Sequence, residues 1–274
     1  MISFLRLGDY GQLGNQMFQF AAVYSLAKNK GYELKIPIEN TVNRNHHGHK
    51  LDLFDCFNIP ETFLIEGNKI QPNISSLYNE VGHHYDKNFF DIEDGTNIQG
   101  YYQTQKYFEN YKEDIYNLFS FKKDLYNKCN KVLYDIKSKY NLEVVSVHIR
   151  RGDYVTNQSS HPLCTLEYYV EAIQSHFSDK NYIFHIFSDD IAWCKEIFSG
   201  ENNLIFSEGN SHFEDMCMLS LSDHNIIANS SFSWWGAWLN QSPIKRVIAP
   251  SNWFGPALSH LNIKDVIPEN WIKI

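Results

Sequence analysis

Two adjacent arginines and an aspartate follow a short apolar stretch near the middle of the chain. Residues 144–149 are rich in valine and isoleucine, which is typical of a buried strand in a parallel sheet, and Arg150, Arg151, Gly152 and Asp153 come next. Ligands of open α/β sheets bind at the carboxyl ends of the strands. The pattern therefore predicts a site for a small anion at the end of this strand.

Three further segments carry glycine, hydroxyl or carboxylate groups where a strand or a helix is expected to begin or end. They are residues 11–16, 188–190 and 230–233. Backbone N–H groups and hydroxyls at helix starts bind phosphate oxygens, although the same features also fit a tight turn and ordinary helix capping. With the two arginines they predict a pyrophosphate site. Asp189 and Asp190 fit either base or ribose recognition or a metal, and we favour the base because the arginines already neutralise charge.

The periodicity of apolar residues predicts alternating strands and helices. The expected strands are 2–7, 34–38, 97–102, 144–149, 182–187, 204–206, 225–228 and 247–249. The expected helices are 15–31, 103–119 either continuous or broken near Asn110, 121–140, 165–177, one ending near 198, 213–221 and one beginning near 230. Residues 40–85 show no clear period. This alternation is typical of an α/β fold with parallel sheets.

Composition narrows the classes of function. The chain has 274 residues, of which 43% are hydrophobic, and 24 basic against 32 acidic residues give a net charge of −8. A negative chain without a block of lysine and arginine is a poor nucleic-acid binder. Five widely spaced cysteines without a Cys-x-x-Cys pair indicate reduced thiols, and no leader or long apolar run is present, so we expect a cytoplasmic protein. His46, His47 and His49, like His83 and His84, lack the spacing of a metal site, and we expect none.

Four ordered motifs resemble those of one enzyme family. They are His-Ile-Arg-Arg-Gly-Asp-Tyr at 148–154, Gly-Gln-Leu-Gly-Asn-Gln-Met-Phe-Gln at 11–19, Ile-Gln-Gly-Tyr-Tyr-Gln at 98–103 and Ala-Asn-Ser-Ser-Phe-Ser-Trp-Trp at 228–235. Together they are similar to the signatures of the α-1,2-fucosyltransferases of glycosyltransferase family 11. The resemblance implies a GT-B-like fold, with two Rossmann-like lobes facing a central cleft. It also implies metal-independent, inverting transfer of fucose from GDP-β-L-fucose to a galactoside, without a cofactor.

The resemblance also assigns lobes and residues. Residues 1–140 would form the acceptor-side lobe, with the tail 250–274 packing back on it, and 141–249 the lobe that binds GDP-fucose. The residues implied for donor binding are His148, Arg150, Arg151, Asp189, Ser231, Phe232, Ser233, Gly14 and Asn15. Among them Arg150 would hold the β-phosphate and Asp189 would read guanine. Asp153 is our first choice of general base, although it fits equally well a role in holding Arg151. Tyr101 and Tyr102 are candidates for contact with the acceptor sugar, with core packing as the alternative.

Three other functions fit parts of this pattern. The same architecture could use another nucleotide sugar, or bind sugar or nucleotide without catalysis. Arg151-Gly152-Asp153 is also the tripeptide of cell-adhesion ligands, but it follows a buried strand in a chain without an export signal. The family implies peripheral contact with the inner membrane and a galactoside-terminated oligosaccharide as acceptor. The sequence names neither the galactoside nor the oligomeric state.

Overall fold

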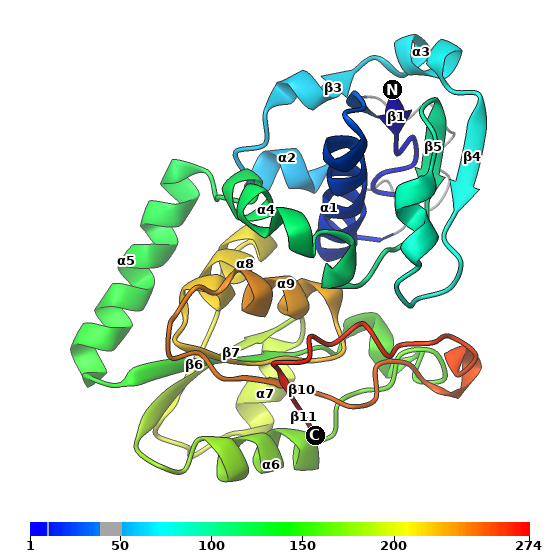
Figure 1. Ribbon diagram of the computed structural model, residues 1–274. Helices are drawn as coiled ribbons and strands as arrows, with labels where there is room; N and C mark the ends of the chain where they lie inside the picture. Colours follow the sequence, from blue (N-terminus) through cyan, green and yellow to red (C-terminus); the bar gives the residue numbers. More distant parts are fainter. Residues whose placement is uncertain (10, 39–50) are drawn as a thin grey trace. The chain divides into compact units, whose positions relative to one another are not determined.

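The chain folds into two α/β units, each built on its own sheet (Figure 1). The computed structural model describes residues 1–9, 11–38 and 51–274. Unit 1 contains Met1–Phe121 and Leu261–Pro268, and unit 2 contains Lys122–His260 and Glu269–Ile274. The predicted α/β class is confirmed, because both sheets pair their strands in parallel.

Unit 1 has a five-stranded sheet in the order β3-β2-β1-β5-β4. Its strands are β1 (Ile2–Ser3), β2 (Leu34–Pro37), β3 (Leu64–Ile65), β4 (Ser76–Asn79) and β5 (Thr96–Gln99). Its α-helices are α1 (Leu13–Lys30), α2 (Asp52–Cys56), α3 (Gly67–Ile70) and α4 (Lys112–Leu118). Helix α1 is largely buried, with Met17, Phe18 and Phe20 in the core. It ends at Gly31, whose φ of 70° places the residue in the left-handed region that favours glycine.

Unit 2 has a six-stranded sheet in the order β11-β10-β9-β6-β7-β8. The strands are β6 (Glu143–Ile149), β7 (Tyr182–Ser188), β8 (Leu204–Phe206), β9 (His224–Ile226), β10 (Val247–Ala249) and β11 (Ile272–Lys273). The helices are α5 (Lys123–Tyr140), α6 (Leu166–His176), α7 (Ile191–Ile197), α8 (His212–Leu221) and α9 (Ser231–Leu239). Helices α6 and α7 lie on one side of the sheet and α8 and α9 on the other (Figure 1).

The position of β6 within this sheet fixes which of its side chains face which layer. Val145, Val147 and Ile149 belong to the core that also contains Tyr169 of α6 and Cys194 of α7. Because successive side chains of a strand point to opposite faces, Ser146 and His148 face the layer of α8 and α9. His148, near the end of β6, therefore faces α9, and Arg150 is the first residue after the strand.

Three predicted elements of unit 1 differ from the structure by more than two residues. The strand expected at 97–102 ends at Gln99, because the chain turns at Gly100, whose φ is 148°. The strand expected at 2–7 is only β1, because turns follow it and Gly8 has a φ of 89°. The helix expected at 103–119 is replaced by short 3-10 turns, Gln105–Tyr107 and Glu109–Tyr111, which precede α4. Tyr107 and Phe108 are fully buried among other aromatic rings, so their apolar character reflects core packing and not one helical face.

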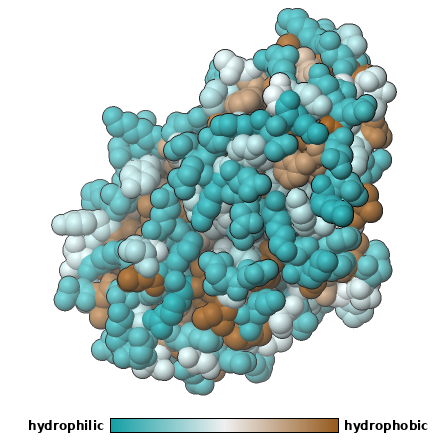
Figure 2. Space-filling view, viewed as in Figure 1, coloured by the Kyte–Doolittle hydropathy of each residue, from teal (hydrophilic) through white to brown (hydrophobic). Residues whose placement is uncertain are grey.

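The visible surface is mostly hydrophilic, with apolar residues scattered over it (Figure 2). None of the described helices is both long enough and apolar enough to cross a membrane.

Candidate functional site

Arg150 stands directly after the central strand β6, among two carboxylates and an aromatic ring. Its Nη1 lies 2.5 Å from Oδ2 of Asp189, and its Nη2 pairs with Oδ1 of Asp153. The guanidinium carbon lies 5.2 Å from the centre of the Tyr154 ring. The side chain of Arg150 is 24% exposed. It is therefore a cation held at the carboxyl end of a parallel strand, where the sequence placed an anion site.

Arg151 has different partners from Arg150. Its guanidinium lies 3.7 Å above the ring of Trp193, and its Nε donates to Oδ2 of Asp190 at 2.9 Å. Asp190 caps α7 by accepting from the backbone N–H of Trp193. A planar guanidinium suits both contacts at once. Arg151 thus ties the loop after β6 to the start of α7.

Asp189 holds both arginines through its two oxygens. Oδ1 accepts the backbone N–H of Arg151 at 2.8 Å, while Oδ2 pairs with Arg150. A Cβ on Gly152 would lie 2.4 Å from Oδ2, which explains why glycine stands at this point of the motif. The family resemblance implies that Asp189 reads guanine, and the sequence gives no sign of these contacts to the two arginines. Guanine recognition by Asp189 stays a prediction.

His148 brings a neutral imidazole to the same edge of the sheet. Burial, together with the nearby Arg150 cation, lowers the pKa of His148 to about 3. Its ring lies 5.6 Å from that of Phe232, and its Nδ1 is buried without a hydrogen-bond partner in the described part of the chain. An unpaired buried nitrogen is rare, so a ligand or a water molecule is needed to satisfy it.

The start of α9 supplies further polar groups. Ser230 precedes the helix without capping it through its side chain, and Ser231 and Phe232 are half-buried. The first N–H groups of a helix have no partner within it and favour anions. Ser233 is buried and its hydroxyl donates to the carbonyls of Ala228 and Ser230, so in this structure that hydroxyl serves the helix start.

Two residues that the sequence reasoning did not single out support this edge. The Tyr154 hydroxyl donates to the carbonyl of Asn229 at 3.1 Å. The Asn229 amide donates to the carbonyls of Pro162 and Trp253. Both residues belong to the motifs quoted above, but their roles depend on contacts between segments far apart in the sequence.

In unit 1 the structure joins the first and third motifs. Asn15, in the first turn of α1 beside buried Gly14, accepts from Nε2 of Gln103 through its Oδ1 at 2.8 Å. Gly11 has a φ of 103°, and a Cβ there would lie 2.0 Å from the Asn15 amide. The loop before α1 therefore needs glycine both for its backbone and for space.

The two tyrosines of the third motif lie in different surroundings. Tyr102 is fully buried, with its ring centre 5.1 Å from that of Phe89 and 5.2 Å from that of Tyr107. Tyr101 is half-buried, and its ring centre lies 5.5 Å from that of His83. Of the pair, Tyr101 is the one whose ring reaches the surface of unit 1.

Metal-ligand clusters are a separate question. Across residues 1–9, 11–38 and 51–274, no group of three or more His, Cys, Asp or Glu side chains is placed to hold a metal ion. His46, His47 and His49 lie outside the described residues.

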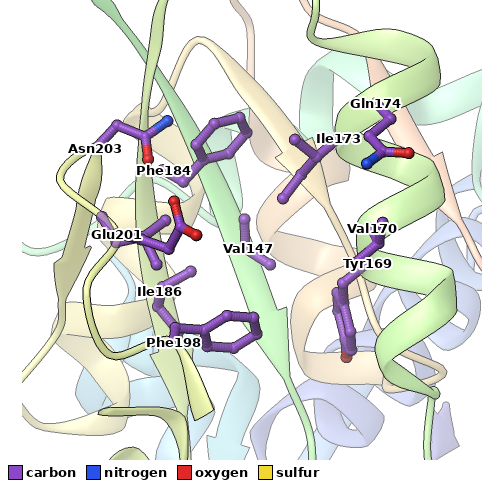
Figure 3. Close-up of a pocket in the computed structure, with 11 residues that line it drawn as sticks. Val147, Tyr169, Val170, Ile173, Gln174, Phe184, Ile186, Phe198, Glu201 and Asn203 are labelled. Carbon is purple, nitrogen blue, oxygen red and sulfur yellow. The ribbon is translucent and has the colours of Figure 1, made fainter. Parts of the chain in front are cut away.

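A cavity of about 280 Å³ lies in unit 2, against the face of the sheet that α6 covers (Figure 3). Val147, Ile186 and Phe184 point into it from the sheet, and Tyr169 and Ile173 from α6. Its lining is mostly apolar and lies on the face of β6 opposite His148. It does not suit a pyrophosphate, and the donor site is not assigned to it.

Comparisons with known proteins complete the description. The model of the family described as glycosyl transferase family 11 matches residues 7–274. An α-1,2-colitosyltransferase of Escherichia coli is 36% identical over 96% of each chain. Galactoside α-(1,2)-fucosyltransferase 2 of Pongo pygmaeus is 24% identical over 84% of this chain and 67% of its own length.

Among solved structures, the fucosyltransferase NodZ from Bradyrhizobium is similar in fold. Its TM-score is 0.52 at 13% identity, over 82% of this chain and 89% of that one. With the two parallel α/β units, this likeness confirms the predicted GT-B-like fold. The cleft between the lobes stays a prediction.

Proposed function

This chain belongs to glycosyl transferase family 11, and from that premise we propose that it transfers L-fucose from GDP-β-L-fucose to the 2-hydroxyl of a terminal β-galactoside. The transfer inverts the anomeric centre and forms an α-1,2 linkage. The observation that carries the proposal is Arg150, a partly exposed cation at the carboxyl end of β6. The last residues of the same strand lie beside the start of α9, since the ring centre of His148 is 5.6 Å from that of Phe232. The name of the Pongo relative, an α-(1,2)-fucosyltransferase, supports this donor.

In the proposed mechanism Arg150 takes up the charge that develops on the departing β-phosphate. A preorganised cation of this kind contributes on the order of 3 kcal/mol to transition-state stabilisation. The first N–H groups of α9, with Ser231 and Phe232, would bind the same phosphates, and His148 would contact the nucleotide. Because an arginine supplies the neutralising charge, the proposed reaction needs no metal. Gly14 and Asn15 are proposed to bind the donor as well.

The proposed general base is Asp153, whose side chain is 63% exposed and pairs with Arg150. Once Arg150 turns to a phosphate, that pairing is released and the carboxylate can accept the proton of the acceptor hydroxyl. The alternative drawn from the sequence, that Asp153 holds Arg151, is not what the structure shows: Asp153 pairs with Arg150, and Arg151 pairs with Asp190. An Asp153→Asn variant with full turnover would show that the reaction does not use this base.

A second donor has a specific observation in its favour. The Escherichia coli relative at 36% identity is named an α-1,2-colitosyltransferase. Colitose is L-fucose without its 3-hydroxyl, so the two donors differ by one hydroxyl group. A site that hydrogen-bonds this hydroxyl would reject the colitosyl donor strongly, whereas an apolar site would discriminate weakly.

The test measures GDP release from GDP-L-fucose and GDP-L-colitose with a panel of β-galactosides in EDTA. We expect acceptor-dependent release from the fucosyl donor that Arg150→Ala reduces by at least about 100-fold. Lys195→Ala, which removes an exposed cation of unit 2, is the matched control and should keep wild-type rates. Turnover of GDP-L-colitose but not of GDP-L-fucose would show that the enzyme transfers colitose and not fucose. Tight GDP binding with no release from either donor would indicate a non-catalytic relative.

A further inference from the structure

The strands β4 and β5 end side by side, and a carboxylate from one holds the backbone of the other. Their register pairs Asn79 with Gln99, so Glu80 and Gly100 are the first residues beyond the two strands. Oε2 of Glu80 accepts the backbone N–H of Tyr101 at 2.6 Å, and Oε1 accepts that of Tyr102 at 2.8 Å. Glu80 also donates its own backbone N–H to the Gln99 carbonyl at 2.8 Å. The carboxylate therefore holds residues 100–103, which we name the motif turn. We call its two hydrogen bonds to the Tyr101 and Tyr102 amides the clasp.

The motif turn has a backbone that needs such support. Gly100 has a φ of 148°, and a Cβ there would lie 2.3 Å from Cβ of Glu80. Tyr102 has a φ of 55°, which is costly for a residue with a side chain, on the order of 1 kcal/mol. Glycine thus makes room for Glu80, and the two hydrogen bonds from Glu80 hold the strained residue in place.

The motif turn carries a buried amide and a half-buried aromatic ring. Gln103 is 7% exposed and donates to Asn15, while its Oε1 is buried without a partner in the described residues. The carbonyl of Gly100 accepts from Nε2 of Gln19 at 3.2 Å. Tyr101, at the same turn, is the tyrosine that reaches the surface. A buried amide oxygen without a partner is rare, and a sugar hydroxyl is a donor that would satisfy it.

We propose that Glu80 is a positioning residue for the acceptor: by clasping the motif turn it places Tyr101 and Gln103 for contact with the galactoside. This inference rests on the proposed function, since it takes the acceptor to be a sugar. Glu80 does not itself touch the substrate. It acts through the two N–H groups that it holds.

The clasp depends on ionised Glu80. Burial raises the pKa of Glu80 to about 7, against the N–H groups of Tyr101 and Tyr102, which lower it. Below that pH one oxygen carries a proton and accepts less well, so the clasp weakens as the pH falls. Four other titratable groups interact with Glu80 or its surroundings: Tyr78 of β4, Asp86, which accepts from the Tyr78 hydroxyl, and Tyr102 and Tyr107. Burial raises the pKa of all three tyrosines, so they stay neutral. The ring centre of His83 lies 5.5 Å from that of Tyr101, with the planes tilted by 32°, so His83 is a further titratable group beside the turn.

The first test compares steady-state kinetics of the wild type and Glu80→Gln from about pH 6 to pH 8.5. The amide replaces one acceptor with a donor that faces a backbone N–H. We expect the acceptor KM to rise about tenfold at the upper pH, the value that follows from losing one hydrogen bond to a charged group, while the donor KM stays within about twofold. In the wild type the acceptor KM should rise as the pH falls through about 7, and in Glu80→Gln this dependence should vanish. Glu93→Gln, at an exposed glutamate of unit 1, is the matched control.

The outcomes separate this inference from the proposed function. An unchanged acceptor KM in Glu80→Gln, in an enzyme that transfers fucose, overturns the inference and leaves the function standing. A pH dependence that persists in Glu80→Gln but disappears in His83→Gln also overturns it. If the wild type transfers no sugar, the proposed function has failed, and with it the acceptor role. Hydrogen exchange then decides the clasp alone: faster exchange of the Tyr101 and Tyr102 amides in Glu80→Gln supports it, and unchanged exchange refutes it.

Discussion

Replacing Gly152 with alanine is expected to disable the anion site through crowding alone. A Cβ at this position would lie 2.4 Å from Oδ2 and 3.2 Å from Cγ of Asp189, closer than carbon and oxygen atoms approach without a shift. The φ of Gly152 lies outside the left-handed region, so backbone strain makes no contribution. Asp189 must therefore move away, and it carries contacts to both Arg150 and Arg151.

The size of the effect follows from those contacts. Overpacking costs about 1–3 kcal/mol, and the hydrogen bond from the Arg151 amide to a charged carboxylate contributes about 1.5–3 kcal/mol. Asp189 and Arg150 are both about a quarter exposed, so their ion pair is screened and adds little. We expect the free energy of unfolding to fall by about 2–4 kcal/mol, or roughly 5–10 °C in Tm. GDP affinity should fall at least about tenfold, because Arg150 loses its anchor.

The assay pairs thermal unfolding with calorimetric titration of GDP. Gly209→Ala is the control in unit 2, because a Cβ there meets nothing within 4 Å and only its φ of 69° opposes the change. That substitution should cost about 1 kcal/mol and leave GDP affinity unchanged. A Gly152→Ala protein with wild-type Tm and GDP affinity would refute the argument that Asp189 anchors the two arginines.

Three further changes test other parts of unit 2. Arg151→Lys should lower the free energy of unfolding in urea by about 1–2 kcal/mol, because an ammonium cannot stack on Trp193 as a guanidinium does. Its GDP affinity should stay within about threefold of the wild type. A loss of GDP affinity as large as that in Arg150→Ala would show that Arg151 binds phosphate. The pKa of His148 is lowered to about 3 in the folded protein, against an ordinary value near 6.5, so its contribution to the free energy of unfolding is full above pH 6.5 and is lost as the pH falls. In His148→Gln the free energy of unfolding in urea should therefore vary less between about pH 6.5 and pH 4. Burial raises the pKa of Asp215 to about 6, so the stability it contributes is full at low pH and lost as the pH rises through 6. Asp215→Asn should therefore gain about 2–3 kcal/mol over the wild type at pH 8 and nothing at pH 4; an equal gain at both would contradict this.

The sequence predicted unit 2 better than unit 1 for a physical reason. Strands 204–206 and 247–249 match the structure, and 144–149 is one residue short, because each is a continuous run of mainly apolar residues, at the sheet edge (β8) as well as at its centre (β6). In unit 1 the edge strand β4 is mostly exposed, and its sequence lacks such a signal. The aromatic residues after β5 favour a helix in the sequence. In the structure the chain turns at residues 100–103, where Glu80, about twenty residues earlier, accepts the amides of Tyr101 and Tyr102, and Tyr107 and Phe108 pack in the core beyond the turn.

The strand-end rule was enough to predict which segments of unit 2 would meet. The register pairs Ile149 with Ser188, so the residues beyond them, Arg150 and Asp189, had to be neighbours. The rule could not divide the work between Arg150 and Arg151, because that depends on the ring of Trp193 and on the space that Gly152 leaves.

The different partners of the two arginines also indicate how Arg150 would bind a phosphate at the proposed site. Of the two carboxylates on Arg150, Asp189 is fixed by the Arg151 amide, whereas Asp153 is 63% exposed and pairs with Arg150 across a single turn of the same loop. A phosphate would compete with both carboxylates for the guanidinium. It would displace Asp153, since an exposed carboxylate regains water at little cost. Asp189 would then keep the guanidinium oriented while Arg150 changes only one of its partners.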